Sequence, residues 1–174
     1  MTLATHVVTG AAVAGALTKD PVAAFLAGWI SHYLLDAIPH WDYKIVSFEA
    51  KDKTKPLDKK VEFGKAFVQD VFKVVADAMI GFLVLAITLW ASGGQVGLPE
   101  TLVLLVGAFG GAFPDFLQFV YGITKVWPVR KLQEFHQFIH AEFRLDDNPR
   151  VGVPLQIAFV ALAGTILLSF VLGN

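Results

Sequence analysis

The chain has 174 residues, of which 55% are hydrophobic and 13% aromatic, and its mean hydropathy is +0.59. A soluble domain rarely reaches this hydropathy, so the composition indicates a membrane protein. The formal net charge of -1 gives no sign of a nucleic-acid partner, and the lack of cysteine excludes disulfides and thiolate metal sites. No basic region precedes the first apolar run, so we expect no cleaved signal peptide.

Five apolar segments approach the length of roughly 20 residues that a membrane-spanning helix needs. The first is short and rich in Ala and Gly, which favours close helix packing over contact with lipid. Pro39 should end the second and Pro114 should break the fourth near its end. The five expected spans are residues 3–17, 21–38, 71–91, 98–121 and 151–172.

Two long connections, residues 43–70 and 122–150, separate these spans. The later half of the first connection predicts a helix that runs into the third span. In the second connection, Pro128 suits the first turn of a helix, and apolar residues recur after it at helical spacing. That stripe predicts an amphipathic helix at the membrane interface. It consists of Leu132, Phe135, Ile139 and Phe143.

With five crossings, the N-terminus and both long connections share one face of the membrane. Of fourteen Lys and Arg residues, only Lys19 falls on the other face, so the positive-inside rule places the N-terminus in the cytoplasm and the C-terminus outside. We therefore expect an all-α integral membrane protein of the inner membrane. It would be a single membrane-embedded domain over residues 1–174, a bundle of about five transmembrane helices plus a cytoplasmic-side interfacial helix.

All the histidines, the aspartates within spans and Asp42, which follows the second span, map to the cytoplasmic half in this arrangement. The histidines took no part in assigning the topology, so their convergence indicates one shared site. An aspartate within a span costs a few kcal/mol unless it is paired, so each one calls for a partner. The residues concerned are His6, His32, His40, His136, His140, Asp36, Asp42, Asp77 and Asp115.

Two spacings in this set favour a metal site. His32 and Asp36 lie four residues apart and so face the same way on a helix. His136 and His140 repeat the spacing by which two imidazoles on one helix reach a single ion. Neutral nitrogen and carboxylate ligands suit zinc, manganese or iron, and we expect a divalent metal, with zinc first.

The expected ligands are His32, Asp36, Asp115, His136 and His140, with His6 and His40 as further candidates. Asp77 or Asp42 would then orient or deprotonate the attacking water, a role that needs direct hydrogen-bond reach to it.

Each of these residues also has a structural interpretation. Two histidines four residues apart, taken alone, more often form the polar edge of an interfacial helix. The Trp beside His40 suits a membrane interface. His6 could cap the first helix, and Asp115 could lie in an ordinary turn. Asp77 lies two turns inside its span and could reach water. Their joint occurrence on one side favours a single site.

The early His-x-x-x-Gly at His6, the Pro-bounded His/Asp cluster and the late histidine pair resemble the small membrane-bound metal-dependent hydrolases of the YdjM type. The resemblance touches most of the chain through short motifs, and it implies a multi-span helical protein with His and Asp ligands near the cytoplasmic face. His6 matches the family's leading histidine. In "IPHWD", His40 replaces the first acid of a Pro-Asp-x-Asp-type motif and Asp42 keeps the second. "HQFIH", residues 136–140, stands in place of a His-Arg-Gly-x-x-His-like element, without the Arg-Gly and one residue shorter.

A divalent metal can bring the pKa of a water molecule to about 7 and polarise an ester or phosphoryl oxygen. We therefore predict a membrane-embedded metal-dependent hydrolase that acts on an ester or phosphoester of a membrane lipid or lipid-linked substrate at the cytoplasmic face. A metal or proton carrier is the main alternative, but such a path needs polar groups through the full membrane thickness. The other alternative is a structural membrane protein in which His/Asp pairs lock the helices, and it predicts stability loss on mutation but no metal.

Overall fold

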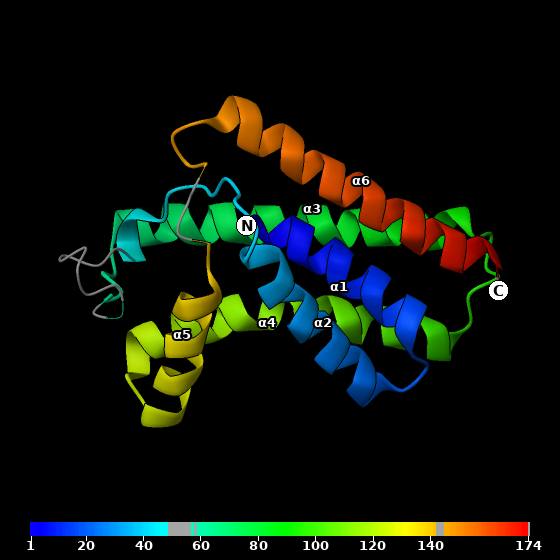
Figure 1. Cartoon of the computed structure of the whole chain (residues 1–174), viewed down its shortest axis with the longest axis horizontal. Helices are drawn as coiled ribbons and strands as arrows, with labels where there is room; N and C mark the ends of the chain where they lie inside the picture. Colours follow the sequence, from blue (N-terminus) through cyan, green and yellow to red (C-terminus); the bar gives the residue numbers. More distant parts are fainter. Residues whose placement is uncertain (49–56, 58, 142–144, 174) are drawn as a thin grey trace.

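The computed structural model describes residues 1–48, 57, 59–141 and 145–173, and over these residues it contains six α-helices, one short 3-10 turn and no strand (Figure 1). The elements are α1 Leu3–Leu17, α2 Pro21–Asp36, η1 Val46–Phe48, α3 Lys65–Ala91, α4 Leu98–Thr124, α5 Trp127–Ile139 and α6 Pro149–Gly173. The prediction of an all-helical protein is confirmed for this part of the chain.

Three of the described helices are long and apolar enough to cross a membrane, namely α3, α4 and α6, with 27, 27 and 25 residues. α1 and α2 have only 15 and 16 residues. At 1.5 Å per residue they are about 22 to 24 Å long, which is less than the roughly 30 Å of a hydrocarbon core. These three candidate spans are consistent with a membrane protein, and the arrangement with five spans stays a prediction.

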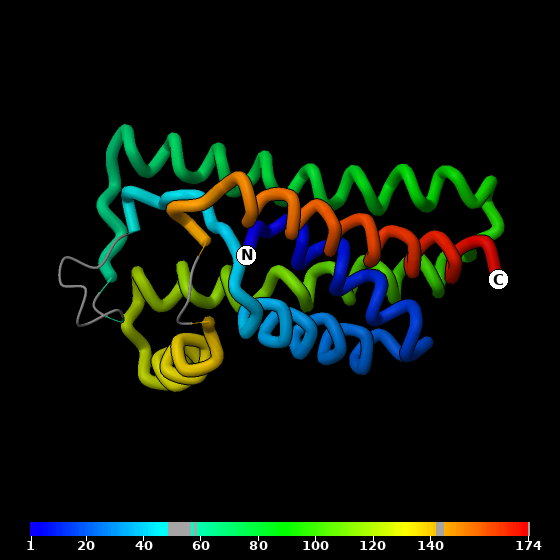
Figure 2. The backbone as a smooth tube through the Cα atoms, turned by 45° about the horizontal axis from the view of Figure 1, so that its top comes forward, coloured from blue at the N-terminus to red at the C-terminus, as the bar shows by residue number. Residues whose placement is uncertain are grey.

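α1 is the central helix of the bundle. Ten of its fifteen residues are buried, against four of 27 in α3. α2, α3, α4 and α6 all pack against it, and Figure 2 shows the dark blue α1 between α6 and α2. Side chains no larger than Val on its buried surface, apart from His6, allow this close packing. The prediction that the composition of this segment favours helix packing over lipid contact is confirmed.

α4 approaches α1 and α2 closely enough for backbone atoms to touch. A β-carbon on Gly10 would lie 2.5 Å from the carbonyl oxygen of Gly107, and one on Gly28 would collide with the same oxygen. A β-carbon on Gly111 would collide with the carbonyl oxygen of His6. Only glycine fits at such contacts, and the last of them brings the backbone of α4 next to one of the histidines of interest.

The end of α2 and the start of α3 differ from the sequence prediction. α2 ends at Asp36 and not at residue 38, because a residue that precedes a proline, here Ile38 before Pro39, avoids the helical conformation. α3 begins at Lys65, six residues before the expected start of the span, so the predicted helix in the first connection is continuous with it.

The expected break at Pro114 is wrong, because α4 continues through this proline to Thr124. A proline is tolerated within a membrane helix where neighbouring groups donate hydrogen bonds to the backbone carbonyls that the proline leaves without a partner. Pro114 has no N–H to donate to the carbonyl of Gly110. The next carbonyl, that of Gly111, accepts a hydrogen bond from the ring of His32 on α2. Asp115 therefore lies within a helix, and the turn interpretation is excluded.

α5 is amphipathic, but its buried face is polar. Gln133 and His136 are buried, whereas Phe135 and Phe138 are 46% and 86% exposed. Leu132 and Ile139 of the predicted stripe are half-buried, and Phe143 lies outside the described residues. The helix thus turns a histidine toward the bundle and two phenylalanines away from it.

Candidate metal centre

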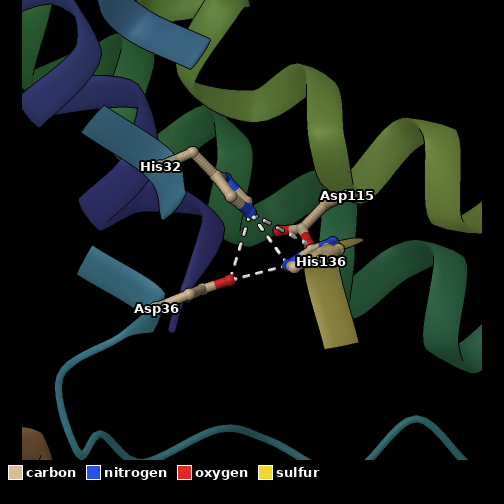
Figure 3. Close-up of side chains that lie close together, drawn as sticks. All are labelled: His32, Asp36, Asp115 and His136. Atoms are coloured by element: carbon tan, nitrogen blue, oxygen red, sulfur yellow. Dashed lines mark hydrogen bonds and ion pairs between the residues drawn. The ribbon is translucent and has the colours of Figure 1, made fainter. Parts of the chain in front are cut away.

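Side chains from α1, α2, α4 and α5, together with the segment after α2, converge on the carboxylate of Asp36. Figure 3 shows four of them, with His32 and Asp36 projecting from α2 toward Asp115 of α4 and His136 of α5. The cluster is buried, and five of its members are at most 1% exposed. These are His6, His32, Asp36, His40 and His136.

Two imidazoles face one oxygen of this carboxylate. Oδ2 of Asp36 lies 3.1 Å from Nε2 of His32 and 2.9 Å from Nε2 of His136. The two Nε2 atoms are themselves 3.3 Å apart. Oδ1 of Asp115 lies 3.9 Å from Nε2 of His32, so a second carboxylate closes this side.

Further nitrogens face the other oxygen. Oδ1 of Asp36 lies 3.2 Å from Nε2 of His6, 3.8 Å from Nε2 of His40 and 3.0 Å from the amino nitrogen of Met1. The ring of His140 is 4.8 Å from that of His40, centre to centre. The ring of His6 also stacks on that of His32, with the ring centres 3.8 Å apart. All five histidines are therefore brought together, as the sequence predicts.

The backbone fixes the tautomer of His32. Its Nδ1 lies 2.7 Å from the carbonyl oxygen of Gly111, and because a carbonyl can only accept, Nδ1 carries the hydrogen. In the neutral ring, Nε2 then presents a lone pair to Oδ2 of Asp36 at 3.1 Å. Two buried acceptors this close require a shared positive charge, either a proton or a metal ion.

The distances in the cluster fit a metal ion. A tetrahedral zinc site with ligands at about 2.0 to 2.1 Å places neighbouring ligand atoms about 3.3 Å apart. Nε2 of His32, Nε2 of His136 and Oδ2 of Asp36 are 2.9 to 3.3 Å from one another. Nε2 of His6 on α1 lies 3.2 Å from Oδ1 of Asp36, a separation in the same range.

Two groups in the described part of the chain could hold an ion, each with ligand atoms within 4.8 Å of one another. The first is His32, Asp36, Asp115 and His136, and the second is Asp36, His40 and His140. Nitrogen and carboxylate donors without sulfur suit zinc, manganese or iron, so this donor set does not identify the metal.

Asp115 marks the accessible edge of the cluster. Its side chain is 35% exposed, whereas those of His32 and Asp36 are at most 2% exposed. At 1.5 Å per residue, Asp115 lies about 26 Å along α4 from Leu98, toward the end of the helix that leads into α5. The cluster thus opens near one end of the bundle.

The expectation that His136 and His140 share one helix is wrong, because α5 ends at Ile139. The N–H of Ala141 donates to the carbonyl of Asp36 at 2.8 Å, so it is not available to continue α5. His136 belongs to the first group and His140 to the second, and the two rings lie 6.0 Å apart between centres.

The two residues expected to act on water lie outside both groups. Oδ2 of Asp77 accepts the N–H of Leu3 at 2.6 Å, so this carboxylate of α3 caps the start of α1. Asp42 accepts the N–H of Tyr43 at 2.9 Å, while its own N–H donates to Asp146 at 3.0 Å. Their roles in catalysis stay predictions.

Tyr43 is a residue of interest that sequence reasoning missed. Burial, and then the negative charge of Asp77, raise the pKa of its phenol, which remains protonated and donates a hydrogen bond to Asp77. Asp77 is therefore held by three donors, the phenol of Tyr43 and the backbone N–H groups of Leu3 and Ala4 at the start of α1. A tyrosine near a membrane interface is commonplace, so no sequence signal singled it out.

A comparison with protein-family models, with curated proteins and with solved structures finds no match to this chain. Fold and site alone therefore define the class of protein. It is an all-helical protein, over the residues described, with three helices that could cross a membrane and a buried His/Asp cluster that could hold a metal ion.

Proposed function

We propose that this protein is a membrane-embedded metal-dependent hydrolase that cleaves an ester or phosphoester of a lipid or lipid-linked substrate. The observation that carries the proposal is the buried approach of His32 and His136 to one oxygen of Asp36, beside the partly exposed Asp115. This arrangement combines a pre-formed cation site with an edge that a substrate can reach. The resemblance to the YdjM-type hydrolases supports the same activity.

The same proposal includes five membrane crossings, with the N-terminus in the cytoplasm and α5 at the cytoplasmic interface. α1 is short for a span, but the surrounding helices shield it from lipid. α2 presents an exposed apolar face with residues at four-residue spacing, as expected of a helix in contact with lipid. These residues are Val22, Leu26, Ile30 and Leu34. The exposed Phe135 and Phe138 of α5 suit the boundary between headgroups and acyl chains.

The residues of the cluster have distinct roles in this mechanism. His32, Asp36, Asp115 and His136 would hold the ion, for which zinc is our first choice. A bound divalent ion supplies Lewis-acid polarisation and lowers the pKa of a water molecule to about 7. The backbone carbonyl of Gly111 keeps Nε2 of His32 turned into the site, and Asp115 leaves the site open to the substrate on its exposed side.

We assign the proton transfer to Asp77 and not to Asp42. Asp77 is held at the start of α1, one helical turn from His6, by the backbone N–H groups of Leu3 and Ala4 and by the phenol of Tyr43. A carboxylate fixed in this way can accept a proton from water and return it to the departing alcohol. In the hydrolysis, the water oxygen bonds to the acyl carbon or phosphorus, the bond to the alcohol oxygen breaks, and the alcohol leaves with the proton.

The direct test is hydrolysis by the detergent-purified protein reconstituted into phosphatidylethanolamine and phosphatidylglycerol vesicles with zinc or manganese. We expect release of phosphate, alcohol or fatty acid from a panel of lipid esters and phosphoesters, and we expect a chelator or His136→Ala to abolish it. The matched control is Glu134→Gln on the outer side of α5, where Glu134 pairs only with Arg130 and Lys131 among the described residues, and it should keep full activity. Metal-loaded protein without any such hydrolysis would contradict the proposal.

Asp77→Ala separates proton transfer from metal binding. We expect it to keep its metal, to lower hydrolysis by about 100-fold or more, and to lower the free energy of unfolding by about 1 kcal/mol through loss of the cap on α1. Asp20→Ala is the control, because Asp20 caps α2 by accepting the N–H of Ala23 at 2.8 Å. This control variant should lose a similar free energy of unfolding and should keep both its metal and its hydrolytic activity. Loss of metal from folded Asp77→Ala would show that Asp77 is a ligand and that the assignment is wrong.

A further inference from the structure

We propose that the cluster holds two divalent cations and that the carboxylate of Asp36 bridges them, with one oxygen on each. The first ion is the one required by the proposed function, on which this inference rests. The second position is formed by Asp36, His40 and His140, with His6 beside it.

The two groups of nitrogens lie on different oxygens of the same carboxylate. His32 and His136 approach Oδ2 at 3.1 and 2.9 Å. His6 and His40 approach Oδ1 at 3.2 and 3.8 Å. Oδ1 also accepts a hydrogen bond from the amino group of Met1 at 3.0 Å, but imidazole nitrogens gather on both oxygens of Asp36, and two histidines face each one.

A backbone carbonyl fixes the tautomer of His40, as it does for His32. Its Nδ1 lies 2.7 Å from the carbonyl oxygen of Ile38, so Nδ1 carries the hydrogen and Nε2 faces Oδ1 of Asp36. A histidine that binds a metal commonly donates its other ring N–H to a carbonyl, which fixes the tautomer and orientation of the ring. The two tautomer-locked histidines, His32 and His40, turn their Nε2 atoms toward opposite oxygens of the one carboxylate between them.

Backbone hydrogen bonds hold the segment after α5 against the segment after α2. Ala141 donates its N–H to the carbonyl of Asp36 at 2.8 Å, and Leu145 donates to the carbonyl of His40 at 2.9 Å. These bonds bring the ring of His140 to 4.8 Å from that of His40, between centres. The end of α5 at Ile139 is thus what places His140 at the second position and leaves His136 at the first.

A second ion favours phosphoesters among the substrates of the proposed function. Two ions about 3.5 to 4 Å apart stabilise both the attacking and the leaving oxygen when water displaces an alcohol from phosphorus. In that step the water oxygen bonds to phosphorus, the bond from phosphorus to the alcohol oxygen breaks, and the alcohol takes the proton that the water loses. The expected products are therefore a phosphate or phosphomonoester and an alcohol, one of them carrying the lipid.

The test measures manganese in the full-length, detergent-purified protein after loading with MnCl₂ and removal of free ions. Elemental analysis should give two ions per chain, and electron paramagnetic resonance should show the spin coupling of a close manganese pair. His40→Ala combined with His140→Ala should reduce the content to one ion, with the six-line signal of isolated manganese. Glu134→Gln on α5 is the control and should keep the coupled pair.

The wild-type result decides the inference even if the double variant fails to fold. One ion per chain, with the electron paramagnetic resonance signal of isolated manganese, would overturn the second position. The amino group of Met1 would then be the partner of Oδ1 of Asp36, and the proposed function would stand. Two ions without spin coupling would also overturn the bridge. No bound ion would overturn the proposed function together with this inference.

Discussion

Asp36→Asn is expected to lower metal affinity more than any other single substitution in the protein. Asp36 lies within 3.2 Å of three imidazoles and of the amino group of Met1, and both of its oxygens are used. Loss of a partner that only orients a ligand costs 10 to 100-fold in affinity, so loss of the charge at the ligand itself should exceed about 100-fold. Zinc titration calorimetry of the detergent-purified variant measures this loss.

Asp20→Asn is the matched control for that experiment. Asp20 and Asp36 lie at opposite ends of α2, and Asp20 contacts the N–H of Ala23 at the start of the helix, away from the cluster. The control should bind zinc as the wild type does. Size-exclusion chromatography of both variants establishes that they are folded, and unchanged zinc affinity in folded Asp36→Asn would show that the cluster is not organised around this carboxylate.

Gly111→Ala is expected to loosen the junction of α1 and α4 and to disturb the site with it. The new β-carbon would collide with the carbonyl oxygen of His6, and the carbonyl of Gly111 itself holds the ring of His32. Overpacking of this kind costs about 1 to 3 kcal/mol, more than the roughly 0.5 to 1 kcal/mol that alanine usually gains over glycine within a helix. The free energy of unfolding should therefore fall, and the metal affinity with it.

Gly164→Ala on α6 provides the comparison. Nothing lies within 4 Å of a β-carbon at Gly164, so this variant should be as stable as the wild type or slightly more stable. Chemical unfolding in detergent, followed by circular dichroism, measures both variants. Equal stability of the two would contradict the backbone contact between α1 and α4.

Local signals in the sequence predict most helix bounds. α1 runs from Leu3 to Leu17 as expected, and α2 begins at Pro21, where Asp20 as the cap and proline in the first turn mark a helix start. The late break expected at Pro114 is wrong, and the carbonyl of Gly111, in the turn before that proline, bonds to His32 on another helix. That partner lies 79 residues away in the sequence, beyond the reach of local pattern.

The sequence also predicts which histidines and aspartates come together, but it does not predict how they are arranged around Asp36. The one-sided distribution of histidines indicates that they meet, and they do. The division of the histidines between the two oxygens of Asp36 depends on tertiary structure, as does the position of His140. The four-residue spacing of His136 and His140 favours a shared helix, and a backbone bond from Ala141 to Asp36 prevents it. The sequence predicts that Asp77 needs a partner but does not identify it, and the structure shows that it caps the start of α1.

The central claim is that the His/Asp cluster binds a metal ion, and the metal content of the detergent-purified protein tests it most directly. Elemental mass spectrometry should find stoichiometric metal in the wild type after reconstitution with zinc, manganese or iron. It should find none, or only residual metal, in a folded variant that combines His136→Ala with His140→Ala. Wild-type protein that holds no metal under any of these conditions would contradict the account and would leave the His/Asp cluster as a lock between helices.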